Sequence, residues 1–175
     1  MQKIFRIIVG LCLLATLGLS SCLKGPEYAI EPRITNVTID KTVIDNFVES
    51  FVVSIDFEDG DADLGAIPDA QGDSGQSFDN VFLVDNRVNI GLDSLFLRAF
   101  SVETLTPSGG TQAIDGTIRV TISEICCFNE SGSAACFPAD VRIDTNEVVF
   151  DVYLVDRAGN TSNVMQTPPL TIRCR

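Results

Sequence analysis

The sequence predicts an all-β domain, arranged as a two-sheet β-sandwich of about seven or eight antiparallel strands. Three observations lead to this expectation. Several segments alternate apolar and polar residues with a period of two, and short clusters of Gly, Asp, Asn and Pro separate them. No stretch of helical length after Cys22 shows a convincing period of 3.6 residues. A closed barrel is the alternative architecture.

The clearest strands are expected in three segments. These are 51–57 (FVVSIDF), 117–123 (TIRVTIS) and 148–156 (VVFDVYLVD). The odd-numbered residues of the first and the even-numbered residues of the other two are predicted to face the core, because successive side chains of a strand point to opposite faces. Weaker alternation predicts further strands at 33–40, 80–88, 95–102 and 170–174.

The N-terminal segment has the features of an export signal. Lys3 and Arg6 precede an uncharged apolar run, Ile7 to Leu19. This run is too short to cross roughly 30 Å of hydrocarbon as a helix, but it has the length of a signal-peptide core. The chain is therefore expected to be exported.

The apolar run ends in Leu-Ser-Ser-Cys, with the cysteine at position 22. This motif resembles the lipobox of bacterial lipoproteins. The resemblance implies that residues 1–21 are removed and that Cys22 carries lipid, followed by a tether to residue 32. Several acyl chains on one residue hold a protein at a bilayer far better than one does. Leu23 rather than Asp after the cysteine favours the outer membrane, by the same resemblance. The alternative is an ordinary secretory signal in which Cys22 has no role.

The predicted domain, residues 33–175, is acidic. The chain has 12 basic and 24 acidic residues, and loss of Lys3 and Arg6 would leave a net charge of −14. Nucleic acid is therefore excluded as an expected partner, since phosphate binding needs clustered Lys and Arg. The membrane is expected to be contacted through the lipid.

Missing residue types exclude several activities. The chain has no His, so the Ser-His-Asp and Cys-His catalytic arrangements and His-based zinc sites cannot form. The chain has no Trp, which weakens a sugar-stacking role. A hydrolase that uses only two carboxylates stays possible in principle, but no spacing identifies such a pair. We expect a protein that is not an enzyme.

Four cysteines lie beyond the predicted signal and lipid site. An even number in an exported chain predicts two disulfides. Adjacent cysteines on a strand point to opposite faces and are expected to have different partners. We expect Cys136 to pair with one of the two adjacent cysteines and Cys174 with the other. A four-thiolate zinc site is the rival, disfavoured because no paired CxxC spacing occurs. The residues are Cys126, Cys127, Cys136 and Cys174.

An acidic turn, FEDGDADLG, follows the first strong strand. Asp59, Asp61 and Asp63 alternate along it, and Ca²⁺ prefers six to eight oxygen ligands of this kind. Asp156 of the later DRAGN turn is a candidate for a further ligand. The EF-hand register fails, because Leu64 occupies the position that needs Gly. The alternative is a solvated turn, since Asp and Gly favour tight turns without any ion.

The C-terminal tail carries a second family resemblance. The segment VYLVDRAGNTSNVMQTPPLTIRC resembles the last hairpin of bacterial immunoglobulin-like domains. Together with the lipobox and the acidic turn, the chain is similar to small lipoproteins with an immunoglobulin-like fold. The resemblance implies a non-catalytic interaction or structural module of the cell envelope, with an envelope protein or a glycan as partner. A glycan-binding accessory lipoprotein of a sugar-uptake system is the alternative.

Overall fold

The computed structural model describes residues 27–46, 48–68, 74–76, 78–87, 97–103, 105, 113–129, 133–136 and 144–174. The predicted signal peptide and Cys22 lie outside this set. The described residues form strands and no helix, so none of them makes a helix suited to crossing a bilayer. Among them the strands are β1 (Arg33–Ile39), β2 (Val43–Asp45), β3 (Phe51–Asp59), β4 (Ile67–Pro68), β5 (Ser74–Gln76), β6 (Asp79–Asp85), β7 (Leu97–Ser101), β8 (Ile114–Ile122), β9 (Cys127–Phe128), β10 (Ala134–Ala135), β11 (Thr145–Val148), β12 (Phe150–Leu154), β13 (Met165–Gln166) and β14 (Leu170–Arg173).

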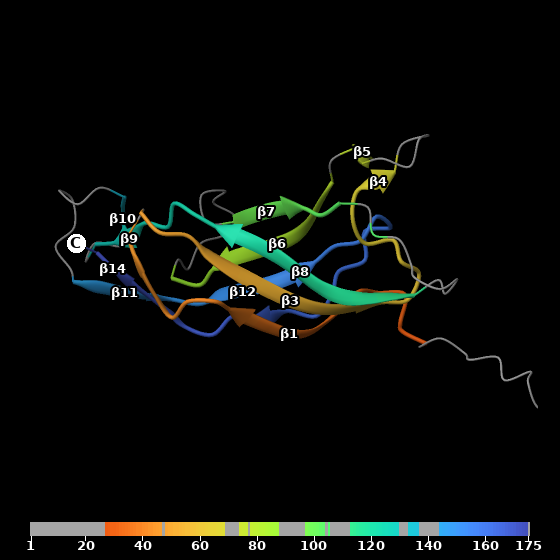
Figure 1. The fold of residues 1–175 in the computed structure, drawn as a ribbon, viewed down its shortest axis with the longest axis horizontal. Helices are drawn as coiled ribbons and strands as arrows, with labels where there is room; N and C mark the ends of the chain where they lie inside the picture. Colours follow the sequence, from red (N-terminus) through yellow and green to blue (C-terminus); the bar gives the residue numbers. More distant parts are fainter. Residues whose placement is uncertain are drawn as a thin grey trace, which may run out of the picture.

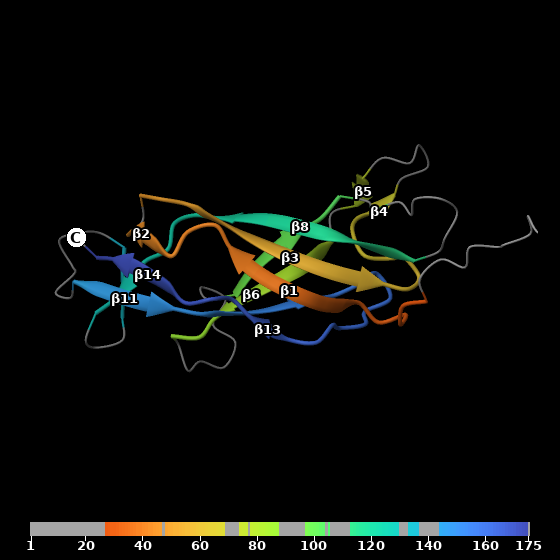
Figure 2. The same ribbon diagram turned by 60° about the horizontal axis from the view of Figure 1, so that its bottom comes forward.

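Two main sheets form the body of the molecule. The first has the order β1-β3-β8 and the second the order β13-β12-β6-β7, and all their pairings are antiparallel. Figures 1 and 2 show the first sheet lying across the second as a separate layer. The architecture is thus all-β, as predicted, and is consistent with a β-sandwich.

The second sheet continues into a smaller one at the C-terminal end of the molecule. Strands β11 and β12 are separated only by Val149, and β11 pairs with β14, which in turn pairs with β2. The β2–β14 pair is parallel. Next to it lies the β9–β10 hairpin, and Figure 1 shows these elements at the end opposite the start of β1.

The core lies between the two layers and follows the predicted alternation. In β3 every odd-numbered residue is buried, and in β8 and β12 the even-numbered apolar residues are buried. Phe51 and Phe150 approach each other across the core with ring centroids 6.1 Å apart. The largest fully buried side chains include Phe51, Phe150, Ile34, Ile44, Ile55, Leu64, Leu83, Ile122, Leu154, Leu170 and Ile172.

Each of the seven predicted segments contains a strand, with ends that shift by a few residues; residue 88 of the segment 80–88 and residues 95 and 96 of the segment 95–102 lie outside the described residues. Three expectations need correction. The described residues form fourteen strands rather than seven or eight, because several pairings are only two or three residues long. The segment 148–156 is not one uninterrupted strand, because the chain changes partners at Val149, from β14 to β6 and β13. The strands are also not all antiparallel, because β2 runs parallel to β14. Strand β2 is only three residues long, which is too short for an alternating pattern to be recognised.

Candidate metal centre

The acidic turn begins where β3 leaves the sheet, and two glycines give it its shape. Gly60 lies against the segment before β1: its N–H donates to the carbonyl of Ala29 at 2.8 Å, and a Cβ at Gly60 would lie 2.4 Å from that oxygen. Gly65 has a φ of 105°, a backbone conformation that favours glycine. Between them the Leu64 side chain is fully buried in the core. The turn is thus held at both ends and in its middle.

Three carboxylates converge in this turn. Asp59, Asp61 and Asp63 each offer an oxygen, and these oxygens lie within 4.8 Å of one another. Asp59 is completely buried, Asp63 is half-buried and Asp61 is exposed. The cluster therefore opens to solvent on the Asp61 side.

Two oxygens in the cluster are buried without a hydrogen-bond partner. One oxygen of Asp59 accepts from the Leu64 N–H at 3.0 Å, but its Oδ1 has no donor, and the same is true of Oδ1 of Asp63. Buried carboxylate oxygens nearly always have partners in folded proteins, because desolvating them costs free energy. A cation is the kind of ligand that would satisfy both oxygens.

The electrostatics of the turn show the same deficit of positive charge. Burial, with contributions from Asp61 and Asp63, raises the pKa of Asp59 to about 6, although the Leu64 N–H acts in the opposite direction. Burial also raises the pKa of Asp63, assisted by the charges of Asp156 and Asp61. Both carboxyl groups thus hold their protons more tightly than usual while no cation is bound.

The DRAGN turn packs against the acidic turn. Asp63 accepts from the Ala158 N–H at 3.1 Å, and its carbonyl accepts from the Arg157 N–H at 3.2 Å. The Arg157 guanidinium donates to the carbonyls of Ala62 and Ala66 at 3.3 and 3.4 Å. The Arg157 guanidinium therefore bonds to backbone carbonyls of the turn. It donates no hydrogen bond to the unpartnered Oδ1 atoms of Asp59 and Asp63.

Asp156, the fourth predicted ligand, is completely buried but is not one of the converging carboxylates. Its two oxygens accept from the backbone N–H and the side-chain amide of Asn160, at 2.7 and 2.8 Å. It shapes the DRAGN turn and adds negative charge beside Asp63. The structure thus brings together three of the four predicted ligands.

The donor set fits a hard cation. Carboxylate oxygens suit Ca²⁺ and Mg²⁺, and neither nitrogen nor thiolate ligands lie in the described cluster. The sequence indicated the three aspartates by their spacing. It gave no sign of Arg157 or Ala29, which reach the turn only through the tertiary fold.

The predicted cysteine pairing is confirmed. Cys126 pairs with Cys136, and Cys127 pairs with Cys174. All four thiols are used, which leaves none for the rival zinc site. The first disulfide closes the β9–β10 hairpin, and the second ties that hairpin to the end of β14.

Comparisons of this chain with protein-family models, with curated proteins and with solved structures found no match. The geometry of the chain itself therefore carries the functional argument.

Proposed function

We propose that this chain is a lipid-anchored, non-catalytic module of the cell envelope whose acidic turn binds a calcium ion. The observation that carries the calcium part is the pair of buried, unpartnered oxygens on Asp59 and Asp63. Two disulfides support an exported protein, since such bonds persist in oxidising compartments. Lipidation at Cys22 rests on the lipobox in the sequence.

The position of the acidic turn suggests what the ion does. The segment just before β1 contacts this turn through the Ala29–Gly60 hydrogen bond, and Tyr28 donates to Asp115 at 3.3 Å. The cation would therefore stiffen the point at which the tether joins the domain. We propose that calcium fixes the orientation of the domain relative to its lipid anchor.

An immunoglobulin-like topology is part of the same proposal. The strand orders β1-β3-β8 and β13-β12-β6-β7 support it, because each sheet combines strands distant in sequence rather than a simple meander. Such domains serve mainly as binding and spacing modules, and that fold-level analogy favours an interaction role over a catalytic one.

Calorimetric titration and thermal unfolding of the calcium-free full-length protein test the ion site. Calcium at a hundredfold excess over its Kd should raise the free energy of unfolding by about 2.7 kcal/mol. The double variant Asp61→Asn, Asp63→Asn should lose this gain. Asp79→Asn is the matched control, because Asp79 is an exposed acid outside the cluster.

Equal midpoints with calcium and with EDTA, at matched ionic strength, would contradict the ion site and leave a solvated turn. A gain of the same size in the double variant would place the calcium elsewhere. Magnesium should give a smaller rise, because it demands a tighter octahedral ligand set than this open turn supplies.

A glycan-binding role is the second candidate, and one feature favours it. Phe82 of β6 and Tyr153 of β12 stack with centroids 5.0 Å apart and planes inclined by 8°, on the face of the sheet away from the core. Both rings are partly exposed. Affinity electrophoresis in polysaccharide gels tests this role: Phe82→Ala should abolish any retardation, and a wild-type protein that migrates freely through all gels would rule the role out for those glycans.

A further inference from the structure

A concave site lies at the other end of the molecule from the acidic turn (Figure 1). A hollow of about 370 Å³ lies there, lined by residues of β6 and β7 on one side and by the β9–β10 hairpin and the segment before it on the other. This volume is in the range of small-molecule sites. The hollow is lined by residues from four regions of the chain, including Asp85, Arg98, Ile125, Phe128 and Phe150.

Two arginines border the hollow, and one of them is already neutralised. Arg87 makes a two-pronged ion pair with Asp85 and donates to the carbonyl of Cys126 at 3.0 Å. Its guanidinium also stacks over the Phe128 ring, 4.6 Å from the centroid. Arg87 is thus a structural residue of the wall.

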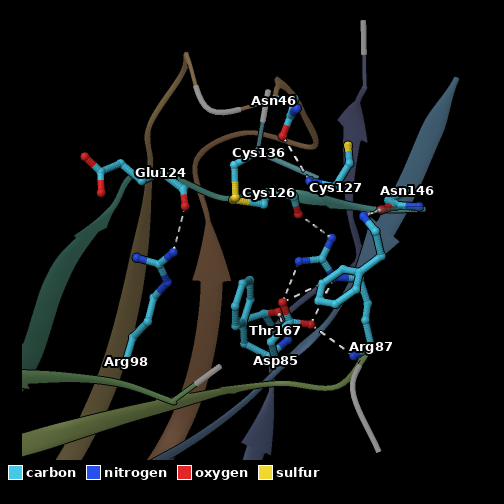
Figure 3. A network of polar contacts seen from close by, with 12 residues as sticks. Asn46, Asp85, Arg87, Arg98, Glu124, Cys126, Cys127, Cys136, Asn146 and Thr167 are labelled. Carbon is cyan, nitrogen blue, oxygen red and sulfur yellow. Dashed lines mark hydrogen bonds and ion pairs between the residues drawn. A yellow bond between two sulfur atoms is a disulfide. The ribbon is translucent and has the colours of Figure 1, made fainter. Parts of the chain in front are cut away.

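Arg98 is different. It lies on β7, is half-buried, and donates one hydrogen bond, from its NH2 group to the carbonyl of Glu124 at 3.0 Å. Figure 3 shows its guanidinium set apart from the Asp85–Arg87 pair, below the Glu124 main chain. Among the described residues it has no ion-pair partner, so most of its five N–H donors are uncommitted.

The charge of Arg98 is poorly compensated. Burial lowers the pKa of Arg98 from its usual value, the charges of Asp85 and Glu124 offset this only in part, and the charge of Arg87 lowers it further. A partly desolvated guanidinium with open donors is the group that a bound anion would neutralise.

The rest of the hollow is apolar and rigid. Ile125, Phe128, Phe150 and the Cys126–Cys136 disulfide supply the walls. The hairpin that carries two of these walls is fixed by the Cys127–Cys174 disulfide and by Asn46, which bonds to the Cys127 N–H and the Ala135 carbonyl. Such a site is largely formed before a ligand arrives, which lowers the entropic cost of binding.

We propose that this hollow binds a small organic carboxylate, with its carboxylate on Arg98 and its apolar body against Phe128 and Phe150. The planar fork of a guanidinium matches a carboxylate in two-pronged geometry. A single negative charge fits better than a phosphate dianion, because Arg98 is one guanidinium and the other arginine of the hollow, Arg87, is already paired with Asp85. This site is separate from the acidic turn and does not depend on calcium.

Fluorescence titration of the full-length protein with dansylglycine tests the proposal. This probe joins one carboxylate to an apolar naphthalene ring that brightens when it leaves water. One molecule should bind per chain, and phenylacetate should displace it. Arg98→Gln should weaken binding roughly tenfold or more, because a charge-assisted hydrogen-bond pair is lost. Arg119→Gln, which removes an exposed arginine on β8, should leave the affinity unchanged.

A second variant guards against a folding defect in Arg98→Gln. Ala134 lines the hollow from an exposed position on β10, so Ala134→Phe should fill the space and block the probe without removing a core contact. Dansylamide, which lacks the carboxylate, should bind weakly and equally to wild type and Arg98→Gln. The proposal is overturned by absence of saturable binding, by equal affinity in wild type and Arg98→Gln, or by displacement by inorganic phosphate as efficient as that by phenylacetate.

Discussion

Asn163 holds both backbone groups of Ile34 and thereby joins the two layers along one edge. The Ile34 N–H donates to Oδ1 of Asn163 at 2.8 Å, and the Asn163 amide donates back to the Ile34 carbonyl at 3.1 Å. Ile34 belongs to β1 of the first sheet, whereas Asn163 lies in the loop before β13 of the second. One side chain thus acts as a strand partner for the free edge of β1.

Asn163→Ala is expected to be strongly destabilising. It would leave the N–H and the carbonyl of the almost fully buried Ile34 without partners. Each unsatisfied group should lower the free energy of unfolding by about 1–3 kcal/mol. Urea unfolding followed by far-UV circular dichroism would measure the loss. Asn36→Ala is the control on the same strand. Among the described residues the Asn36 side chain bonds to Asp56 alone, at the exposed surface, so its loss should lower the free energy of unfolding by under about 1 kcal/mol. Equal losses in the two variants would contradict a bridging role for Asn163.

The two disulfides should differ in stability and in accessibility. Cys127 and Cys174 are buried and 47 residues apart, whereas Cys126 and Cys136 are partly exposed and 10 apart. Closing these loops contributes about 4 and about 3 kcal/mol in the chain-entropy model. Replacement of Cys127 and Cys174 by alanine should lower the free energy of unfolding more than the same replacement of Cys126 and Cys136, because it also leaves a cavity in the core.

Graded reduction followed by alkylation and peptide mass mapping shows which of the two disulfides is reduced first. Cys126 and Cys136 should be labelled at lower reductant concentrations than the buried pair, in the folded protein. Labelling of Cys174 before Cys136 would show that burial does not protect the Cys127–Cys174 disulfide.

The sequence predicted the parts of this fold that depend on local pattern. The period of two in β3 and β8 gave both the strands and their buried faces, because one side of each strand packs on the core. The different partners of Cys126 and Cys127 followed from the expectation that adjacent cysteines point apart, whereas which of them pairs with Cys136 was left open by the sequence. The three converging aspartates followed from their alternate spacing.

The remaining features arise from contacts between distant segments. Arg157, Asn163 and Arg98 are ordinary polar residues in the sequence. Their roles appear only when segments 95, 129 and 26 residues away in the chain come into contact with them. Asp156 has the right type and a nearby position for a ligand, but its own turn occupies its oxygens. Local spacing cannot reveal this competition between a turn and an ion.

The lipid anchor makes a prediction about Cys22, which lies outside the described residues. Cys22→Ser should move the protein from the detergent phase to the aqueous phase, or leave it as an uncleaved precursor, because the acylated thiol is lost. Phase partitioning and intact mass measure this directly. Cys12→Ser is the matched control and should be processed normally, since Cys12 lies in the segment removed. A Cys22→Ser protein of processed mass, still in the membrane fraction, would exclude this anchor.

The acidic turn should make stability depend on pH in a way that calcium removes. Without an ion, the folded-state pKa of Asp59 is raised to about 6, whereas an unfolded Asp titrates near 3.9. The folded state therefore binds more protons than the unfolded state between these values, and stability falls as pH rises through this window. Deprotonation of Asp59 is expected to lower the free energy of unfolding by on the order of 2 kcal/mol, and this change is complete by about pH 7.

Calcium should abolish this fall, because the ion favours the charged form of Asp59 that burial disfavours. Urea unfolding at a series of pH values, with EDTA and with saturating calcium, gives the two curves. They should meet near pH 4, where protons compete with the ion, and separate increasingly toward pH 7. Asp59→Asn cannot titrate at this position and should lose most of the calcium-free slope between pH 4 and pH 6, leaving the part that the raised pKa of Asp63 contributes. The prediction fails if the wild-type protein keeps its slope in saturating calcium and Asp59→Asn keeps the same slope without calcium. Another group would then carry the pH dependence, and Asp59 would not face a cation.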